Sequence, residues 1–150
     1  YWGLLMGADF RRDQAAGGVN GLLNYGYTVL RACMARAVVA AGLHPTPSLH
    51  HRNEGNALRL VDDLMEPFRP VVDLRVWRLA QQGRTEVDAT TKRTLVAALF
   101  DEMKTDVGST PVVVCTQRLA VSLAQVFLGE RQRLDLPAAG LVSSGPALVA

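Results

Sequence analysis

Acidic side chains gather on one face of a predicted helix near the middle of the chain. At 100° per residue, Asp62, Asp63 and Glu66 fall on one arc, opposite the apolar residues of the same segment. Like charges at this spacing repel one another, and acids near a helix C-terminus meet the negative end of the dipole. A positive partner is therefore expected, and the candidates are Arg59, Arg69 or a divalent cation.

The loop just before this helix could supply an imidazole to such a cation. All three histidines of the chain lie between residues 43 and 55, and His50 and His51 are the nearest to the acids. Carboxylates with a neutral imidazole suit a divalent ion. A zinc site is less expected, because the donors are rich in oxygen and Cys33 and Cys115 lie elsewhere in apolar runs. The simpler alternative is a solvated polar face with a chance histidine pair.

Other catalytic motifs are missing from the sequence. It contains no Gly-x-Ser-x-Gly elbow for a serine nucleophile, and Gly17-Gly18 lacks the Gly-Lys-Ser/Thr ending of a phosphate loop. The net charge of +2 points to no class of partner, but 14 of the 16 basic residues are Arg. Arg binds phosphate through planar, bidentate hydrogen bonds, so a polyanionic partner is compatible with this bias, as is a GC-rich source.

The length and composition fit one globular domain. The chain has 150 residues, of which 49% are apolar and 20% charged. Neither a charged-then-apolar leader nor a run of 18 apolar residues occurs, so a soluble cytoplasmic protein is expected. The chain begins with the apolar run Tyr1 to Met6 rather than with Met, which suggests a piece of a longer protein.

Apolar periodicity predicts an all-α fold of about five helices, with no strand alternation long enough for a sheet. The longest helix follows Gly18 and stops at Gly42. Residues 1–137 are expected to form the domain and 138–150 a flexible C-terminal tail. The other expected elements are a loop over 43–55, a helix capped by Asn56 that ends or kinks near Pro67, a helix from Val71 to about Gly83, a helix capped by Thr90 or Thr91 whose apolar face reaches Met103, a loop over 106–110, a helix from Pro111 to Gly129, and a loosely held stretch from Leu134 onward.

Poor helix formers interrupt the first long helix. Asn20, Gly21, Asn24 and Gly26 together cost it stability relative to Ala, so each needs a reason to be there. Close packing against another helix is one reason. Hydrogen bonding of Asn24 or Tyr25 to the active region or to DNA is the other.

Three motifs then resemble a known family. They are Asn24-Tyr25-Gly26-Tyr27, Leu49-His50-His51-Arg52-Asn53 and Asp62-Asp63-Leu64-Met65-Glu66-Pro67-Phe68-Arg69-Pro70-Val71-Val72-Asp73. In this order they resemble the CRISPR-associated spacer-acquisition integrases (the Cas-one family), most closely its type II members. The C-terminal catalytic domain of that family is all-helical, which agrees with the periodicity.

The resemblance implies a metal site. Family members hold a divalent ion, Mg²⁺ or Mn²⁺, with a glutamate, a histidine and a later acid. The histidine and the later acid map onto His51 and Glu66 as catalytic metal ligands, with Asp63 as a further acidic contributor. The first glutamate would lie a few residues before Tyr1, so this fragment alone is expected to be inactive.

The resemblance also implies a reaction and partners. The 3′ hydroxyl of a spacer fragment would attack a phosphodiester of the CRISPR repeat. Double-stranded DNA, a second copy bound through an N-terminal β domain that is absent here, and a small subunit of the adaptation complex would be the partners, with no membrane involved. DNA contacts are expected at Arg52, Arg59, Arg69, Asn24 and Tyr25. A non-catalytic DNA-binding or subunit-assembly module and a purely structural bundle remain the alternatives.

Overall fold

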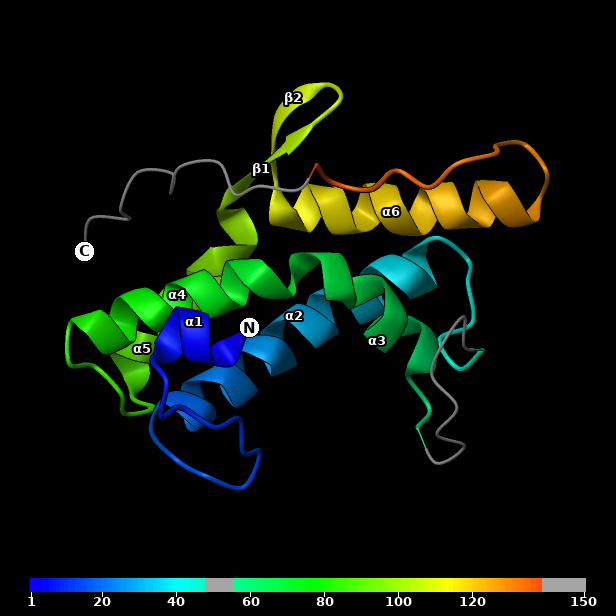
Figure 1. Ribbon diagram of the computed structural model, residues 1–150. Coiled ribbons are helices and arrows are strands. Elements are labelled where there is room, and N and C mark those ends of the chain that lie inside the picture. Colours follow the sequence, from blue (N-terminus) through cyan, green and yellow to red (C-terminus); the bar gives the residue numbers. More distant parts are fainter. Residues whose placement is uncertain (48–55, 139–150) are drawn as a thin grey trace.

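One central helix organises the fold (Figure 1). The computed structural model describes residues 1–47 and 56–138. Within them the chain is all-helical apart from one hairpin, as predicted, and α2 packs against α3, α4, α5 and α6. The elements are α1 (Trp2–Met6), α2 (Val19–Ala40), α3 (Arg59–Met65), the 3-10 turn η1 (Glu66–Phe68), α4 (Arg69–Gln81), α5 (Ala89–Ala97), the 3-10 turn η2 (Ala98–Phe100), β1 (Glu102–Thr105), β2 (Gly108–Pro111) and α6 (Val112–Phe127).

The prediction of the long helix is confirmed, and so is close packing as the reason for one of its glycines. Leu23, Leu30 and Met34 of α2 are fully buried among the surrounding helices. A Cβ on Gly26 would lie 2.4 Å from Cγ1 of Val72 on α4, so only glycine allows the two helices to approach this closely. After Ala40, Gly42 takes a positive φ of 76° and ends the helix.

A sharp bend joins α3 to α4. Pro67, which has no N–H to continue an α-helix, lies in η1, and the predicted kink is confirmed. The buried ring of Phe68 fixes the bend to the core. The predicted N-cap is wrong: α3 begins at Arg59, because the side chain of Asn56 instead accepts a hydrogen bond from the N–H of Leu58 at 3.0 Å and closes a turn.

The start of α5 also differs from the prediction. Its N-cap is Asp88, whose Oδ1 accepts from the N–H groups of Thr90 at 2.8 Å and Thr91 at 2.7 Å. The Thr91 hydroxyl accepts in return from the N–H of Asp88, which completes a capping box. Thr91 is therefore the third helical residue rather than the cap.

A β-hairpin replaces the end of the predicted fourth helix. β1 and β2 pair antiparallel, with Thr105 opposite Gly108, and Gly108 has a φ of 108°. Met103 is buried from β1 rather than from a helix face, and Phe100 of η2 is mostly exposed. The predictions of a helix face that reaches Met103 and of a loop over 106–110 were wrong, because four-residue strands are too short to show a period of two clearly.

The stretch after α6 is held more firmly than predicted. Residues 134–138 run back along α6 in Figure 1. The N–H of Asp135 donates to Oγ of Ser122 at 2.9 Å, its carboxylate accepts from Nε of Arg118 at 2.8 Å, and the N–H of Ala138 donates to the carbonyl of Lys104 at 2.9 Å. Residues 139–150 lie outside the described part of the chain, so the flexible tail stays a prediction. Within the described ranges, every helix is too short or too polar to cross a bilayer.

Candidate functional site

The bend at Pro67 positions the acid on which the predicted chemistry depends. Glu66 is the first residue of η1, and half of its side-chain surface is exposed. Its Oε1 forms an ion pair with Nη2 of Arg69 at 3.0 Å. Asp63 precedes it by three residues on α3, close enough in the helix for both carboxylates to serve one site. His50, His51 and Arg52 lie between residues 48 and 55, outside the described residues.

The acids of the predicted acidic face have partners from different parts of the chain. Arg31 of α2 binds Asp62 with both arms of its guanidinium, Nε to Oδ1 at 2.7 Å and Nη2 to Oδ2 at 2.9 Å. The amide of Asn56 also donates to the Asp62 carboxylate at 2.5 Å. The predicted partner Arg59 instead donates to the backbone carbonyl of Thr46 at 3.1 Å. Sequence reasoning missed Arg31; its charge within the apolar periodicity of α2 was the available signal.

Arg69 supplies the positive charge for Glu66, one of the three predicted options. Its guanidinium carbon also lies 5.1 Å from the centre of the Tyr27 ring on α2, a cation–π distance. Among the described residues, its Nε is buried and has no hydrogen-bond partner. Arg69 therefore contacts an acid and an aromatic ring while one of its donors stays unused.

A buried carboxylate lies behind this contact. Asp73 of α4 is 3% exposed and accepts hydrogen bonds from the hydroxyls of Tyr1 and Tyr27. Burial raises the pKa of Asp73, against the opposing effect of the two hydroxyls, Arg69 and Arg12. Burial and the bond to Asp73 raise the pKa of both tyrosines, so they remain protonated donors. Sequence reasoning missed this cluster, although an acid between the apolar Val72 and Val76 was a signal.

The two predicted DNA contacts on α2 have partners within the protein. Arg12 donates to Oδ1 of Asn24 at 2.6 Å and to Oδ1 of Asn20 at 3.0 Å, which ties the segment before α2 to the helix. The ammonium of Lys92 lies 5.6 Å from the centre of the Tyr25 ring. These contacts explain why the asparagines are tolerated inside the helix. A role of Asn24 and Tyr25 in DNA binding stays a prediction.

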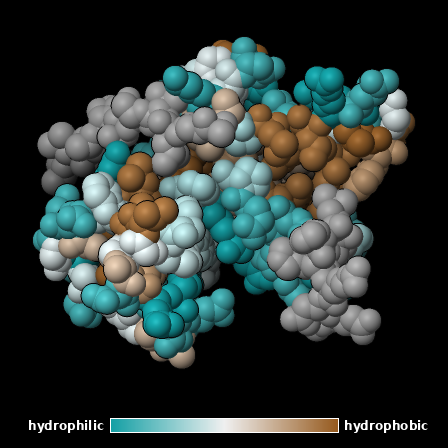
Figure 2. Space-filling model, viewed as in Figure 1, coloured by the Kyte–Doolittle hydropathy of each residue, from teal (hydrophilic) through white to brown (hydrophobic). Residues whose placement is uncertain are grey.

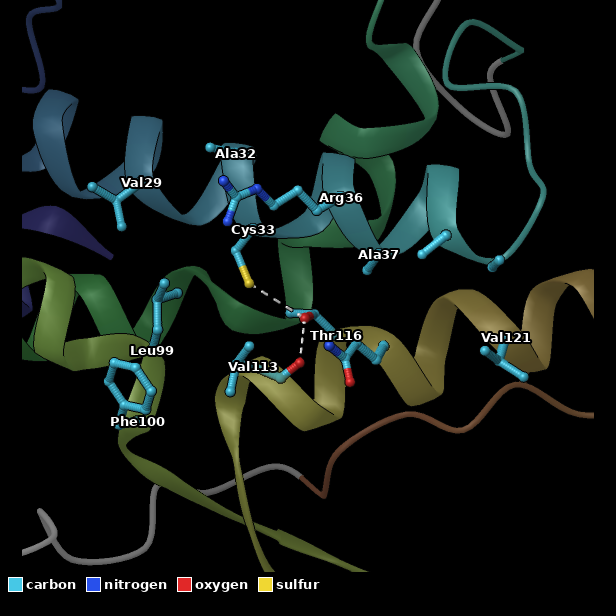
Figure 3. A pocket seen from close by; sticks show the side chains of 13 residues that line it. Val29, Ala32, Cys33, Arg36, Ala37, Leu99, Phe100, Val113, Thr116 and Val121 are labelled. Atoms are coloured by element: carbon cyan, nitrogen blue, oxygen red, sulfur yellow. Dashed lines mark hydrogen bonds between the residues drawn. The ribbon is translucent and has the colours of Figure 1, made fainter.

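A separate groove runs between α2 and α6 (Figure 3). Its volume is about 720 Å³, and Val29, Phe100 and Val121 contribute apolar walls. Sγ of Cys33 lies 3.5 Å from the hydroxyl of Thr116 within it. Apolar side chains also gather along α6 in Figure 2. The described residues that line the groove include one cation, Arg36, and neither a carboxylate nor a predicted site residue, so acid–base or metal chemistry has no basis there.

The donors around the bend fit a hard divalent cation in kind. Asp63 and Glu66 offer carboxylate oxygens, the ligands that Mg²⁺ and Mn²⁺ prefer. Glu66 is exposed enough to reach an ion. Within residues 1–47 and 56–138, no three His, Cys, Asp or Glu side chains are placed together to hold a metal. The predicted ligand His51 lies outside those ranges, so the metal site stays a prediction.

Comparison with known proteins identifies relatives. The family model described as CRISPR associated protein Cas1 matches residues 11–107. The CRISPR-associated endonuclease Cas1 of Neisseria meningitidis serogroup C is 43% identical over 90 residues, which are 60% of this chain and 29% of that protein. A CRISPR-associated endonuclease Cas1 of Pyrobaculum aerophilum is 37% identical over 125 residues, 81% of this chain and 41% of that protein.

One solved structure is also similar to this chain. A casposase bound to integration product matches with a TM-score of 0.74 and 26% identity, over 90% of this chain and 46% of that one. The chain thus spans less than half the length of each of these three relatives.

Proposed function

The chain belongs to the Cas1 family, and we propose that the whole protein of which it forms part is a metal-dependent DNA integrase and endonuclease of CRISPR adaptation. In this role it inserts spacer DNA into the CRISPR array. One observation carries the proposal: the family match spans residues 11–107 and includes the bend that leaves the Glu66 carboxylate half exposed. The structural neighbour, a casposase bound to integration product, supports integration as the reaction class.

The proposed site holds one Mg²⁺ or Mn²⁺ with His51, Glu66 and Asp63, together with a glutamate upstream of Tyr1. When bound, such an ion offsets the charge that develops on the phosphoryl oxygens. His51 binds as the neutral imidazole, and the two acids bind as carboxylates. The bend at Pro67 fixes the direction in which Glu66 points relative to Asp63.

The proposed reaction is a transesterification. The 3′ oxygen of the spacer forms a new bond to a phosphorus of the repeat, and the bond from that phosphorus to the repeat's own 3′ oxygen breaks. The proton of the attacking hydroxyl leaves, and the departing oxygen gains one. The number of phosphodiester bonds is unchanged, so no external energy source and no covalent enzyme intermediate are needed.

The proposed partners follow from family membership. They are double-stranded DNA of spacer and repeat, a second copy of the whole protein, and a small subunit of the adaptation complex. Arg52 and Arg59 are proposed to contact DNA phosphates, since Arg forms bidentate bonds to phosphate. In the described structure Arg59 uses only Nε within the protein, on the carbonyl of Thr46.

The test uses the whole protein with His51→Ala and Glu66→Ala. Each change is expected to reduce spacer integration into a repeat-containing duplex more than about 100-fold, because each removes a metal ligand. Thermal unfolding should stay close to wild type, since Glu66 is half exposed. The matched control is Glu130→Gln, an exposed acid beyond α6, which should integrate normally.

Two outcomes would contradict the proposal. Normal integration by both His51→Ala and Glu66→Ala would remove the site assignment. A whole wild-type protein that binds DNA in a salt-dependent manner but never joins strands would favour the non-catalytic binding module instead.

A further inference from the structure

Arg69 contacts the carboxylate of Glu66 and the aromatic ring of Tyr27. Its bond to Glu66 is an ion pair between neighbours three residues apart, with 36% and 50% of the two side chains exposed. Pairs this exposed are weak, because water and salt screen them. On its other side the guanidinium lies over the Tyr27 ring at 5.1 Å.

The Tyr27 ring is a fixed support. Its hydroxyl donates to the buried carboxylate of Asp73 on α4, which also accepts from Tyr1, the residue before α1. The guanidinium of Arg12 lies 5.8 Å from the same ring. Because this support does not involve Glu66, Arg69 can lose its acid partner and still stay beside the site.

The guanidinium also has donors to spare. Arg carries five N–H donors and no acceptor. Of these, Nη2 is used on Glu66, while Nε is buried without a partner among the described residues. Because Nε is buried, the Nη side of the planar fork, once released from Glu66, is the part that can offer donors to the oxygens of a phosphate.

We propose that Arg69 is the counter-charge of Glu66 in the metal-free protein, leaves it when a divalent cation binds that carboxylate, and then binds a DNA phosphate from its place on Tyr27. This inference rests on the proposed function, because it takes Glu66 as a metal ligand. The exchange has a simple electrostatic reason. A divalent ion on Glu66 uses the carboxylate oxygens and repels the guanidinium, and an incoming phosphate attracts it.

The first experiment measures Mn²⁺ affinity of the whole protein without DNA. Arg69→Gln removes the competitor for Glu66, so Mn²⁺ should bind about threefold to tenfold more tightly. Arg69→Lys keeps the charge and should bind Mn²⁺ within about twofold of wild type. The control Arg93→Gln removes an equal charge from an exposed position on α5, at the opposite end of Figure 1 from α3, and should leave the affinity unchanged. An unchanged or weaker affinity in Arg69→Gln would overturn the proposal.

The second experiment measures binding of a short synthetic duplex, with Ca²⁺ or with EDTA. In Ca²⁺, Arg69→Gln should bind about threefold to tenfold more weakly, and the slope of log affinity against log salt should fall by about one phosphate contact. In EDTA the difference should shrink, because Arg69 then stays on Glu66. An equal loss with and without the metal would make Arg69 an ordinary phosphate contact and overturn the exchange.

A third variant separates this inference from the proposed function. Glu66→Gln must weaken Mn²⁺ binding if Glu66 is a metal ligand. If Glu66→Gln binds Mn²⁺ like wild type, the proposed metal site fails. If Glu66→Gln weakens binding while Arg69→Gln fails to tighten it, only the exchange by Arg69 fails. Thermal unfolding of each variant shows whether it is folded.

Discussion

Glu66 and Asp73 are carboxylates on either side of the same bend, with opposite surroundings. Glu66 lies on η1 with half of its side chain exposed, and one partly exposed arginine pairs with it. Asp73 lies two turns further along, on α4, is 3% exposed, and accepts from two tyrosines. Arg69 forms an ion pair with Glu66, and its charge acts to lower the pKa of Asp73 against the effect of burial. The guanidinium of Arg69 also lies over the Tyr27 ring.

The difference separates two roles that an acid can have within one short stretch. An exposed, singly paired carboxylate can exchange its partner for a metal ion at little cost. A buried carboxylate with two hydroxyl donors cannot, because any exchange would leave those donors unsatisfied. We infer that Asp73 holds the helices together while Glu66 stays available, and the following changes probe that division.

The largest expected effect on stability is at Asp73. Asp73→Ala leaves the hydroxyls of Tyr1 and Tyr27 without their acceptor, so the free energy of unfolding should fall by about 3 kcal/mol. Glu66→Ala removes one exposed ion pair and should lower it by less than about 1 kcal/mol. Urea unfolding of both variants measures the contrast. Equal losses would show that Glu66 is as structural as Asp73.

A smaller effect is expected where α2 and α4 touch. Gly26→Ala places a Cβ 2.4 Å from Cγ1 of Val72, next to Asp73, and overpacking should cost more than the gain in helix propensity. The net loss should be about 1–2 kcal/mol in urea unfolding. The second change Val72→Ala should recover part of it, since the two sites are in contact. Gly17→Ala, which meets nothing within 4 Å, is the control and should stay within about 0.5 kcal/mol of wild type. A loss in the control as large as in Gly26→Ala would mean that close packing is not the cause.

Local interactions could be predicted from the sequence, and interactions between distant residues could not. The periodicity of α2 and the position of Pro67 are local signals, and both were sufficient to place the helix and the bend. The Asp88 cap is local as well, but a nearby threonine offered the same function and the acid was overlooked. The hairpin was missed because strands of four residues carry little pattern.

The pairing of charges was beyond sequence reasoning. Asp62 looked like one of three equivalent acids, yet Arg31, 31 residues earlier in the chain, binds it. Asp73 receives donors from Tyr27 and Tyr1, which are 46 and 72 residues away. Such contacts depend on how the helices pack, and periodicity states only which face of a helix is buried. Helical spacing pointed to the acids and to the pair His50 and His51, and the family motifs then selected His51 and Glu66 among them.

The smallest expected effect is a dependence on pH, and it tests why Asp73 differs from an exposed acid. Burial raises the pKa of Asp73 in the folded protein above its unfolded value of about 4. The folded state then holds the proton more tightly than the unfolded state, so the contribution of Asp73 to stability falls as pH rises from about 4 through the raised pKa, and is constant above it. The difference in unfolding free energy between wild type and Asp73→Asn, measured in urea across this range, should fall in the same way.

The direction in which this difference in unfolding free energy changes with pH decides between two physical accounts of the buried acid. A fall with rising pH means that the loss of water around Asp73 outweighs the two tyrosine hydroxyls and the charges of Arg69 and Arg12. A rise with pH would mean the reverse, with the hydroxyls and arginines stabilising the anion. In that case the anion of Asp73 would attract Arg69, and the release of Arg69 to a phosphate would carry a larger electrostatic cost.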